Sequence, residues 1–173
     1  EGGLLKSDVV ITEKLDGNRC VAHYDGEKWC FTSRSGKPMN VDFDMSGMNT
    51  DYIYDGEVMS ELQTDMSVKR YDAILRDEEF NFDTKEAQLM FNETSGLINR
   101  HGAKKGLVYN VFDIVCDEPY YVRRTELAKC EPFGNVRIVP LLYSGHNREQ
   151  IQNLLYKVTQ MGGEGIMLNL LDR

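Results

Sequence analysis

The chain has 173 residues, of which 41% are hydrophobic and 28% are charged, as is ordinary for a folded domain with its own core. No segment is apolar for long enough to cross a bilayer, and the first residues, EGGLLKSD, lack the basic start and apolar core of a signal peptide. The net charge of −8 argues against a strong duplex binder, because phosphate affinity comes from clustered Lys and Arg, although a small nucleotide pocket needs only a few cations.

The first half of the chain is typical of antiparallel strands. Asp25-Gly26 is a strong hairpin signal, and the polar stretch SRSGKPMN predicts a loop. Between residues 60 and 76 the pattern is ambiguous, since RYDAIL is compatible with a strand or a helix. Strands are predicted over residues 8–13, 20–24, 28–33 and 52–58, the last interrupted by Asp55-Gly56.

The second half alternates helices with strands. A helix is predicted over residues 84–99 with Thr84 as its cap, and a clearer one over 148–161 with Asn147 as its cap. Residues 107–116, LVYNVFDIVC, predict a central strand buried on both faces. Further strands are expected over residues 136–143 and over IMLNLL, residues 166–171, which Glu164-Gly165 precedes. Hairpins with helices in the long connections favour an α+β fold with antiparallel sheets.

The four cysteines do not form a C-x-x-C pair, which argues against a zinc site. We expect them to be small buried hydrophobic residues in a reducing compartment. They are Cys20, Cys30, Cys116 and Cys130.

Four short clusters place charged or aromatic residues at the border of a predicted strand, where a fold holds polar groups rigidly. Taken singly, each has an ordinary interpretation, because Asp-Gly is most often a turn and a phenylalanine most often belongs to the core. The clusters are K-x-D-G-x-R from Lys14 to Arg19, Asp55-Gly56-Glu57, Phe112-Asp113 and Glu164-Gly165.

The first cluster carries the most chemistry. Its pattern fixes four residue types, and a chance match in a chain of this length is on the order of one in a thousand. A protonated lysine is a poor nucleophile, so a catalytic Lys14 needs burial or nearby cations such as Arg19, Arg34 and Lys37. Gly17 allows close backbone approach to a bound group. The competing interpretation is a solvated lysine followed by a turn.

Five segments in order resemble motifs I, Ia, III, IIIa and IV of the covalent nucleotidyltransferases, which include ATP-dependent DNA ligases, RNA ligases and mRNA capping enzymes. The resemblance spans residues 13–168 and implies an α+β, ATP-grasp-like adenylation domain, with antiparallel sheets flanked by helices around a nucleotide cleft. SRSGK and YDGEV are more similar to the motifs of DNA ligases than to those of capping enzymes. ETSGLINR resembles the corresponding helix of T-even-type phage DNA ligases. The motif segments are KLDGNR, SRSGK, YDGEV, YNVFDIV and EGIML.

The resemblance implies a role for each motif residue. Lys14 would attack the α-phosphate of ATP, expel pyrophosphate and hold AMP as a phosphoramide, with Asp16 near the reacting phosphate. Arg19 and Glu57 would contact the ribose, and Phe112 would stack on adenine. The remaining roles fall to Thr12 or the backbone of Glu13 at the base edge, Arg34 on a phosphate of ATP or of the nicked strand, and Glu57 and Glu164 at Mg²⁺.

The same resemblance implies ATP and Mg²⁺ as cofactors, nicked duplex DNA as the partner, no membrane, a monomer, and the cytoplasm of a bacterial or phage-infected cell. Motif V, a pair of lysines, and the oligonucleotide-binding domain that normally follows do not occur within residues 1–173. We therefore expect an adenylation domain cut from a longer chain, which by itself binds ATP poorly or slowly and does not seal nicks.

Several alternatives stay open. An RNA ligase would use the same lysine chemistry, a capping enzyme would use GTP, and a degenerate member of the fold would bind nucleotide without catalysis. An NAD⁺-dependent ligase is disfavoured, because neither a nicotinamide-binding segment nor a four-cysteine zinc site is present. The acidic run RDEEFNFD and the basic pairs Lys104-Lys105 and Arg123-Arg124 are expected to be solvated surface, although the basic pairs have the charge to touch a DNA backbone.

Overall fold

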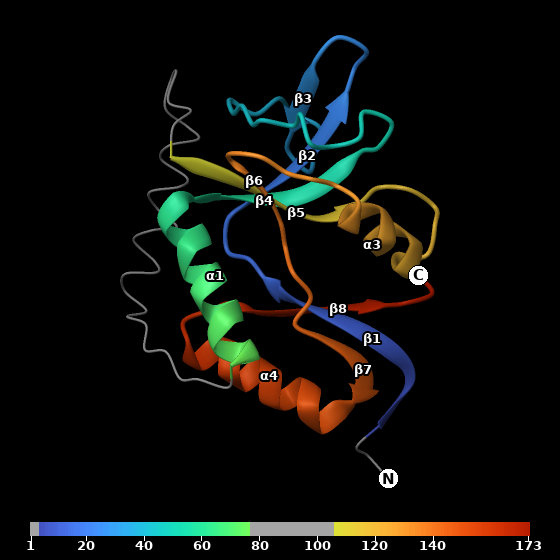
Figure 1. Ribbon diagram of the computed structural model, residues 1–173, viewed down its shortest axis with the longest axis vertical. Helices are drawn as coiled ribbons and strands as arrows, with labels where there is room; N and C mark the ends of the chain where they lie inside the picture. Colours follow the sequence, from blue (N-terminus) through green and yellow to red (C-terminus); the bar gives the residue numbers. More distant parts are fainter. Residues whose placement is uncertain (1–3, 77–105) are drawn as a thin grey trace.

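The computed structural model describes residues 4–76 and 106–173, with side chains from residue 8 onward. Its strands form two separate sheets, which lie one above the other in the view of Figure 1. The smaller sheet has the strand order β7-β1-β8, formed by Tyr143–Asn147, Leu4–Lys14 and Gly165–Leu170. The larger sheet has the order β3-β2-β4-β5-β6, formed by Trp29–Thr32, Asn18–Tyr24, Tyr54–Ser60, Leu107–Ile114 and Val136–Ile138.

The pairing confirms the predicted α+β fold with antiparallel sheets. Among the strand pairs of the described residues, all are antiparallel except β5 with β6. The predicted hairpin joins β2 to β3, and the positive φ of 103° at Gly26 is a conformation that glycine adopts without steric cost. Strand β4 is continuous, and the expected interruption at Asp55-Gly56 is a register shift against β5.

The main core lies against the larger sheet. Its largest fully buried side chains are aromatic: Tyr54 on β4 and Tyr109 on β5. The phenol of Tyr109 donates to the backbone carbonyl oxygens of Cys20 (2.8 Å) and Tyr54 (3.2 Å), so its hydroxyl is satisfied although it is buried. β5 is an interior strand with most side chains buried, as its composition predicts.

Helix α4 (Arg148–Gln160) begins where the sequence predicts. The side chain of Asn147 accepts hydrogen bonds from the backbone N–H groups of Glu149 and Gln150. Its buried residues pack with Val9 and Ile11 of β1 in a second core cluster, which covers the smaller sheet; they are Ile151, Leu154 and Val158.

Helix α1 (Glu61–Leu75) resolves the ambiguous stretch after β4. Its buried face is mostly polar, which explains why apolar periodicity did not reveal it. The side chain of Ser60 caps the helix by accepting from the N–H of Gln63. The buried residues are Gln63, Thr64, Ser67, Arg70 and Ala73.

The predicted strand over residues 136–143 is wrong as a single element. Val136–Ile138 forms β6 in the larger sheet, and the chain then crosses to the smaller sheet, where Tyr143–Asn147 forms β7. Pro140 lies in the crossing segment, where its missing N–H removes no ladder hydrogen bond. Figure 1 shows this crossing between the two sheets.

Helix α3 (Tyr120–Ala128) was not predicted, and its N-cap residue, Pro119, makes no side-chain cap hydrogen bond. The expectation that Arg123-Arg124 faces solvent is wrong. Arg123 Nε donates to Asp113 Oδ1 of β5 at 2.8 Å, and Arg124 Nη2 donates to the carbonyl oxygen of Val139 at 2.7 Å. Both arginines therefore attach α3 to the larger sheet.

Of the four free cysteines, Cys20 is buried as predicted, Cys30 and Cys130 are half-buried, and Cys116 is exposed, which contradicts the expectation for that residue. The expected helix over residues 84–99, the ETSGLINR segment, residues 77–83 of the acidic run and Lys104-Lys105 lie outside the described residues. Within the described ranges, no helix is long and apolar enough to cross a membrane.

Candidate active site

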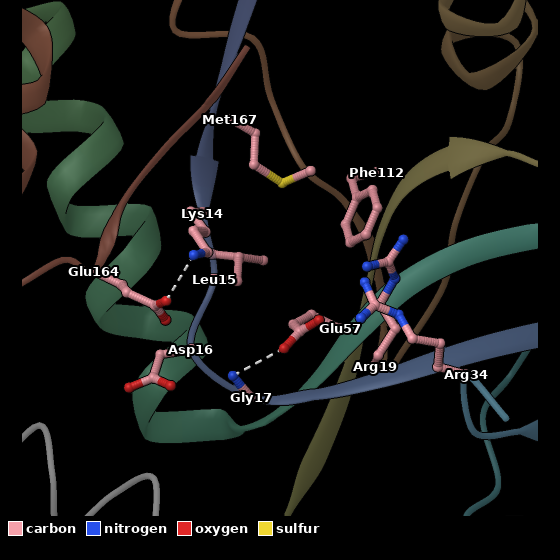
Figure 2. Close-up of a pocket in the computed structure, with 10 residues that line it drawn as sticks. All are labelled: Lys14, Leu15, Asp16, Gly17, Arg19, Arg34, Glu57, Phe112, Glu164 and Met167. Atoms are coloured by element: carbon pink, nitrogen blue, oxygen red, sulfur yellow. Dashed lines mark hydrogen bonds and ion pairs between the residues drawn. The ribbon is translucent and has the colours of Figure 1, made fainter. Parts of the chain in front are cut away.

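Lys14 is the last residue of β1, and strand pairing places it beside the start of β8. Its Cα partner in the β1–β8 ladder is Gly165. The adjacent Glu164 therefore meets it, with Lys14 Nζ 3.2 Å from Glu164 Oε1 (Figure 2). The lysine side chain is 56% exposed, so its amine is accessible from the pocket.

The segment after Lys14 carries the chain from the smaller sheet to β2 of the larger one. At Gly17 the backbone N–H donates to Glu57 Oε2 at 3.0 Å. A Cβ at this position would lie 2.3 Å from the carbonyl oxygen of Val58 on β4. Close approach to β4 therefore requires glycine here.

Arg19 is fixed by β4. Its Nε and Nη2 donate to the two carboxylate oxygens of Asp55 at 2.6 and 2.5 Å, the bidentate geometry that arginine favours. This hydrogen bonding raises the pKa of Arg19. The guanidinium carbon also lies 5.0 Å from the centroid of the Phe112 ring, which comes from β5.

These residues line one pocket of about 500 Å³ (Figure 2). Seven of the nine residues predicted from the sequence are among its walls, and they come from segments far apart in the chain. The complete lining is Lys14, Leu15, Asp16, Gly17, Arg19, Arg34, Glu57, Phe112, Glu164 and Met167.

Two predicted residues do not line this pocket. Thr12 is 1% exposed, and Glu13 is buried with its carboxylate bound to α1. Conversely, the sequence did not single out Met167 or the anchoring role of Asp55. Asp55 belongs to the YDGEV motif, and the pairing of β2 with β4 brings it to Arg19, a contact for which the sequence has no local signal.

The pocket is lined by both cationic and carboxylate side chains. Burial raises the pKa of Glu57 to about 7, although the Gly17 N–H and Arg19 act in the opposite direction. The pKa of Asp16 is also raised, first by burial and then by the neighbouring Glu164, while Lys14 lowers it. Glu164 raises the pKa of both Asp16 and Glu57, because like charges repel. A cation bound among these carboxylates would favour their charged forms.

The donor chemistry of Asp16, Glu57 and Glu164 fits Mg²⁺, which takes hard oxygen ligands. In the described part of the chain, no three His, Cys, Asp or Glu side chains are arranged to hold a metal ion by themselves. Mg²⁺ in nucleotide sites usually takes only one or two carboxylates and completes its shell with water and phosphate oxygens. The residues present therefore fit a metal bound together with a nucleotide.

Solved structures of DNA and RNA ligases are among those that share this fold. A chain from a structure–function study of Lig E DNA ligases is 17% identical with a TM-score of 0.65, covering 95% of this chain and 56% of that one. The ATP-dependent DNA ligase from bacteriophage T7, in complex with ATP, is 16% identical with a TM-score of 0.63, covering 94% and 57%. An archaeal ATP-dependent RNA ligase is 13% identical with a TM-score of 0.58, covering 98% and 41%.

The chain thus spans between 41% and 57% of the length of these structures. A comparison with curated proteins found no match. The family model of the ATP-dependent DNA ligase domain matches residues 4–172, nearly the whole chain. The chain therefore belongs to the ATP-dependent DNA ligase domain family.

Proposed function

We propose that this domain catalyses the adenylation step of an ATP-dependent DNA ligase, with Lys14 as the residue that carries AMP. The observation that carries the proposal is the meeting of the predicted motif residues around one amine. Lys14, Arg19, Glu57, Phe112 and Glu164 come from five different strands or strand borders and line a single pocket.

The proposed reaction joins the lysine to the nucleotide. Lys14 Nζ attacks the α-phosphorus of ATP, an N–P bond forms, and the P–O bond to pyrophosphate breaks. The amine must lose a proton, and Glu164, whose Oε1 lies 3.2 Å from Nζ, is positioned to accept it. Charge neutralisation by the pocket cations and positioning of the phosphate supply most of the catalysis.

The nucleotide is proposed to lie along the pocket. The Phe112 ring would stack on adenine, and Arg19 and Glu57 would contact the ribose. Arg34 is exposed at the pocket and would bind a phosphate. The base-edge contact of Thr12 or of the Glu13 backbone stays a prediction.

Mg²⁺ would be held by Glu164 and Glu57 together with nucleotide phosphate, with Asp16 close by, and would neutralise phosphate charge when bound. In the later steps AMP would pass to the 5′-phosphate at a nick in duplex DNA, and a 3′-hydroxyl would displace it. We expect a monomer that acts in DNA repair or replication in the cytoplasm of a bacterial or phage-infected cell. We also expect a further oligonucleotide-binding domain with motif V in the complete ligase.

The test is a mass measurement after incubation with ATP and Mg²⁺. We expect the wild-type chain to gain the mass of one AMP, and Lys14→Ala to gain none because the nucleophile is removed. Lys28→Ala, a change at an exposed lysine of the β2–β3 hairpin, is the matched control and should gain AMP like the wild type. A gain that survives Lys14→Ala would place the chemistry elsewhere. Because residues 1–173 alone are expected to bind ATP poorly or slowly, the incubation is long and at high ATP concentration, and no gain in the wild type under these conditions would favour a non-catalytic nucleotide-binding module.

Nucleotide and substrate choice need separate assays. We expect ATP and not GTP to label the protein covalently, since labelling by GTP would indicate a capping enzyme. With the complete ligase, sealing of nicked DNA in preference to nicked RNA is expected, and the reverse preference would identify an RNA ligase.

A further inference from the structure

We infer that helix α1 positions Lys14 for the proposed adenylation by holding a residue on each side of it, through Arg70 on the Glu13 carboxylate before the lysine and Gln63 on the Asp16 carbonyl after it. The inference deepens the proposed function and rests on it. It also assigns a role to a segment for which the sequence motifs imply none.

The first anchor precedes Lys14. Side chains alternate along a strand, so the side chain of Glu13 points away from that of Lys14. Its carboxylate is buried and accepts hydrogen bonds from Ser67 Oγ at 2.9 Å and from Arg70 Nε at 2.9 Å. Arg70 Nη2 also lies 2.7 Å from Glu13 Oε2. The residue before the nucleophile is therefore held by two side chains of α1.

The second anchor follows Lys14. Gln63 Nε2 donates to the backbone carbonyl oxygen of Asp16 at 2.7 Å. Gln63 lies in the first turn of α1, and its own N–H is bound by the Ser60 cap. One helix thus holds residues 13 and 16 at once, and the backbone of Lys14 lies between these two points.

Arg70 also contacts the strand border that carries the partner of Lys14. A Cβ on Gly163 would lie 3.2 Å from Arg70 Nε, so this glycine packs closely on the guanidinium. Gly163 directly precedes Glu164, which pairs with the lysine amine. Arg70 therefore lies against the residue that precedes each member of the Lys14–Glu164 pair.

The helix is itself bound to the larger sheet by polar contacts. Arg137 of β6 donates to Asn110 Oδ1 at 2.9 Å and to Ser67 Oγ at 3.4 Å. Asn110 of β5 donates to Thr64 Oγ1 at 3.2 Å. This network connects β1 to the sheet that carries Glu57 and Phe112. It therefore holds the Lys14 amine in place relative to the pocket residues that are proposed to bind the nucleotide.

The chemistry explains why such a network has value at this place. Buried ion pairs add little to stability compared with apolar side chains of similar volume. Attack on phosphorus, in contrast, depends steeply on geometry, and a misplacement of about 1 Å can lower a rate by about 10²-fold. A rigid origin for an otherwise exposed lysine side chain meets that requirement.

The experiment compares Gln63→Met, and the paired change Glu13→Gln with Arg70→Met, against Lys69→Met. The paired change avoids leaving one buried charge without its partner. Lys69 is adjacent to Arg70 on the exposed side of α1 and is the matched control. We measure the single-turnover rate of Lys14–AMP formation at saturating ATP, the affinity for a non-hydrolysable ATP analogue, and the thermal midpoint.

We expect both test variants to adenylate at least about tenfold more slowly, because Lys14 is displaced. For Gln63→Met, which changes no residue of the proposed nucleotide site, the affinity for the analogue should change by less than about twofold. Lys69→Met should match the wild type. A merely structural role would lower the thermal midpoint and the affinity together with the rate. Rates equal to the wild type in both variants would overturn the inference while leaving the proposed function intact.

A crystal structure of Gln63→Met separates the two proposals. We expect the Lys14–Glu164 separation to grow beyond ion-pair distance. If the wild type forms no Lys14–AMP, the proposed function fails, and this structure still decides the positioning role. Retention of the 3.2 Å Lys14–Glu164 contact in that variant would overturn it.

Discussion

Glu57 lines the pocket from β4, and its carboxylate accepts the Gly17 N–H while most of its surface is removed from water. Burial raises its pKa from 4.5 to about 7. Between these two values the folded protein retains a proton that the unfolded chain has lost. The free energy of unfolding therefore falls as the pH rises through this window, and the loss is complete above the folded pKa.

A Glu57→Gln variant should remove this dependence, because the amide oxygen still accepts the Gly17 N–H and carries no charge. Near pH 8, in buffer with EDTA, we expect it to be more stable than the wild type by up to about 3 kcal/mol, and near pH 4.5 the difference should vanish. Urea unfolding at both pH values measures this. Glu27→Gln, at an exposed hairpin position, is the control. Identical pH dependence in Glu57→Gln and wild type would show that this carboxyl group does not titrate as described.

At the scale of elements, the two long helices were not equally predictable. Helix α4 has an apolar face of Ile151, Leu154 and Val158, and its cap is encoded in the residues that directly precede it. Helix α1 buries Gln63, Ser67 and Arg70, whose partners are elsewhere in the chain, so its sequence has the period of a helix without an apolar stripe. Local periodicity therefore identified α4 and left α1 ambiguous.

The cap of α4 makes a direct prediction. Asn147→Ala should lower the free energy of unfolding by about 1 kcal/mol, because two N–H groups at the helix start lose their acceptor. Asn153→Ala, an exposed change within the same helix, removes no cap and should be neutral or slightly stabilising. Urea denaturation of both variants gives the comparison. Equal effects of the two substitutions would contradict a capping role.

At the scale of the whole molecule, Gly17 lies on the short connection between the two sheets, where β2 approaches β4. Gly17→Ala should lower stability by about 1–3 kcal/mol, since its Cβ would lie 2.3 Å from a backbone oxygen and the sheets must shift. Gly165→Ala is the matched control, because its nearest neighbour would be Leu155 Cδ1 at 3.9 Å. Thermal unfolding that ranks the two variants equally would contradict a steric requirement at the junction.

The sequence by itself determined the α+β class, most strands, the capped helix α4 and the order of the family motifs, because turns, caps, periodicity and motif spacing are local properties of a chain. Seven of the nine candidate site residues that the sequence predicts line one pocket. Only the tertiary structure decided that Asp55 holds Arg19, that Arg70 binds Glu13, and that residues 136–143 divide between two sheets. Those outcomes depend on strand register and on buried polar partners distant in sequence, for which a chain carries no local periodic signal.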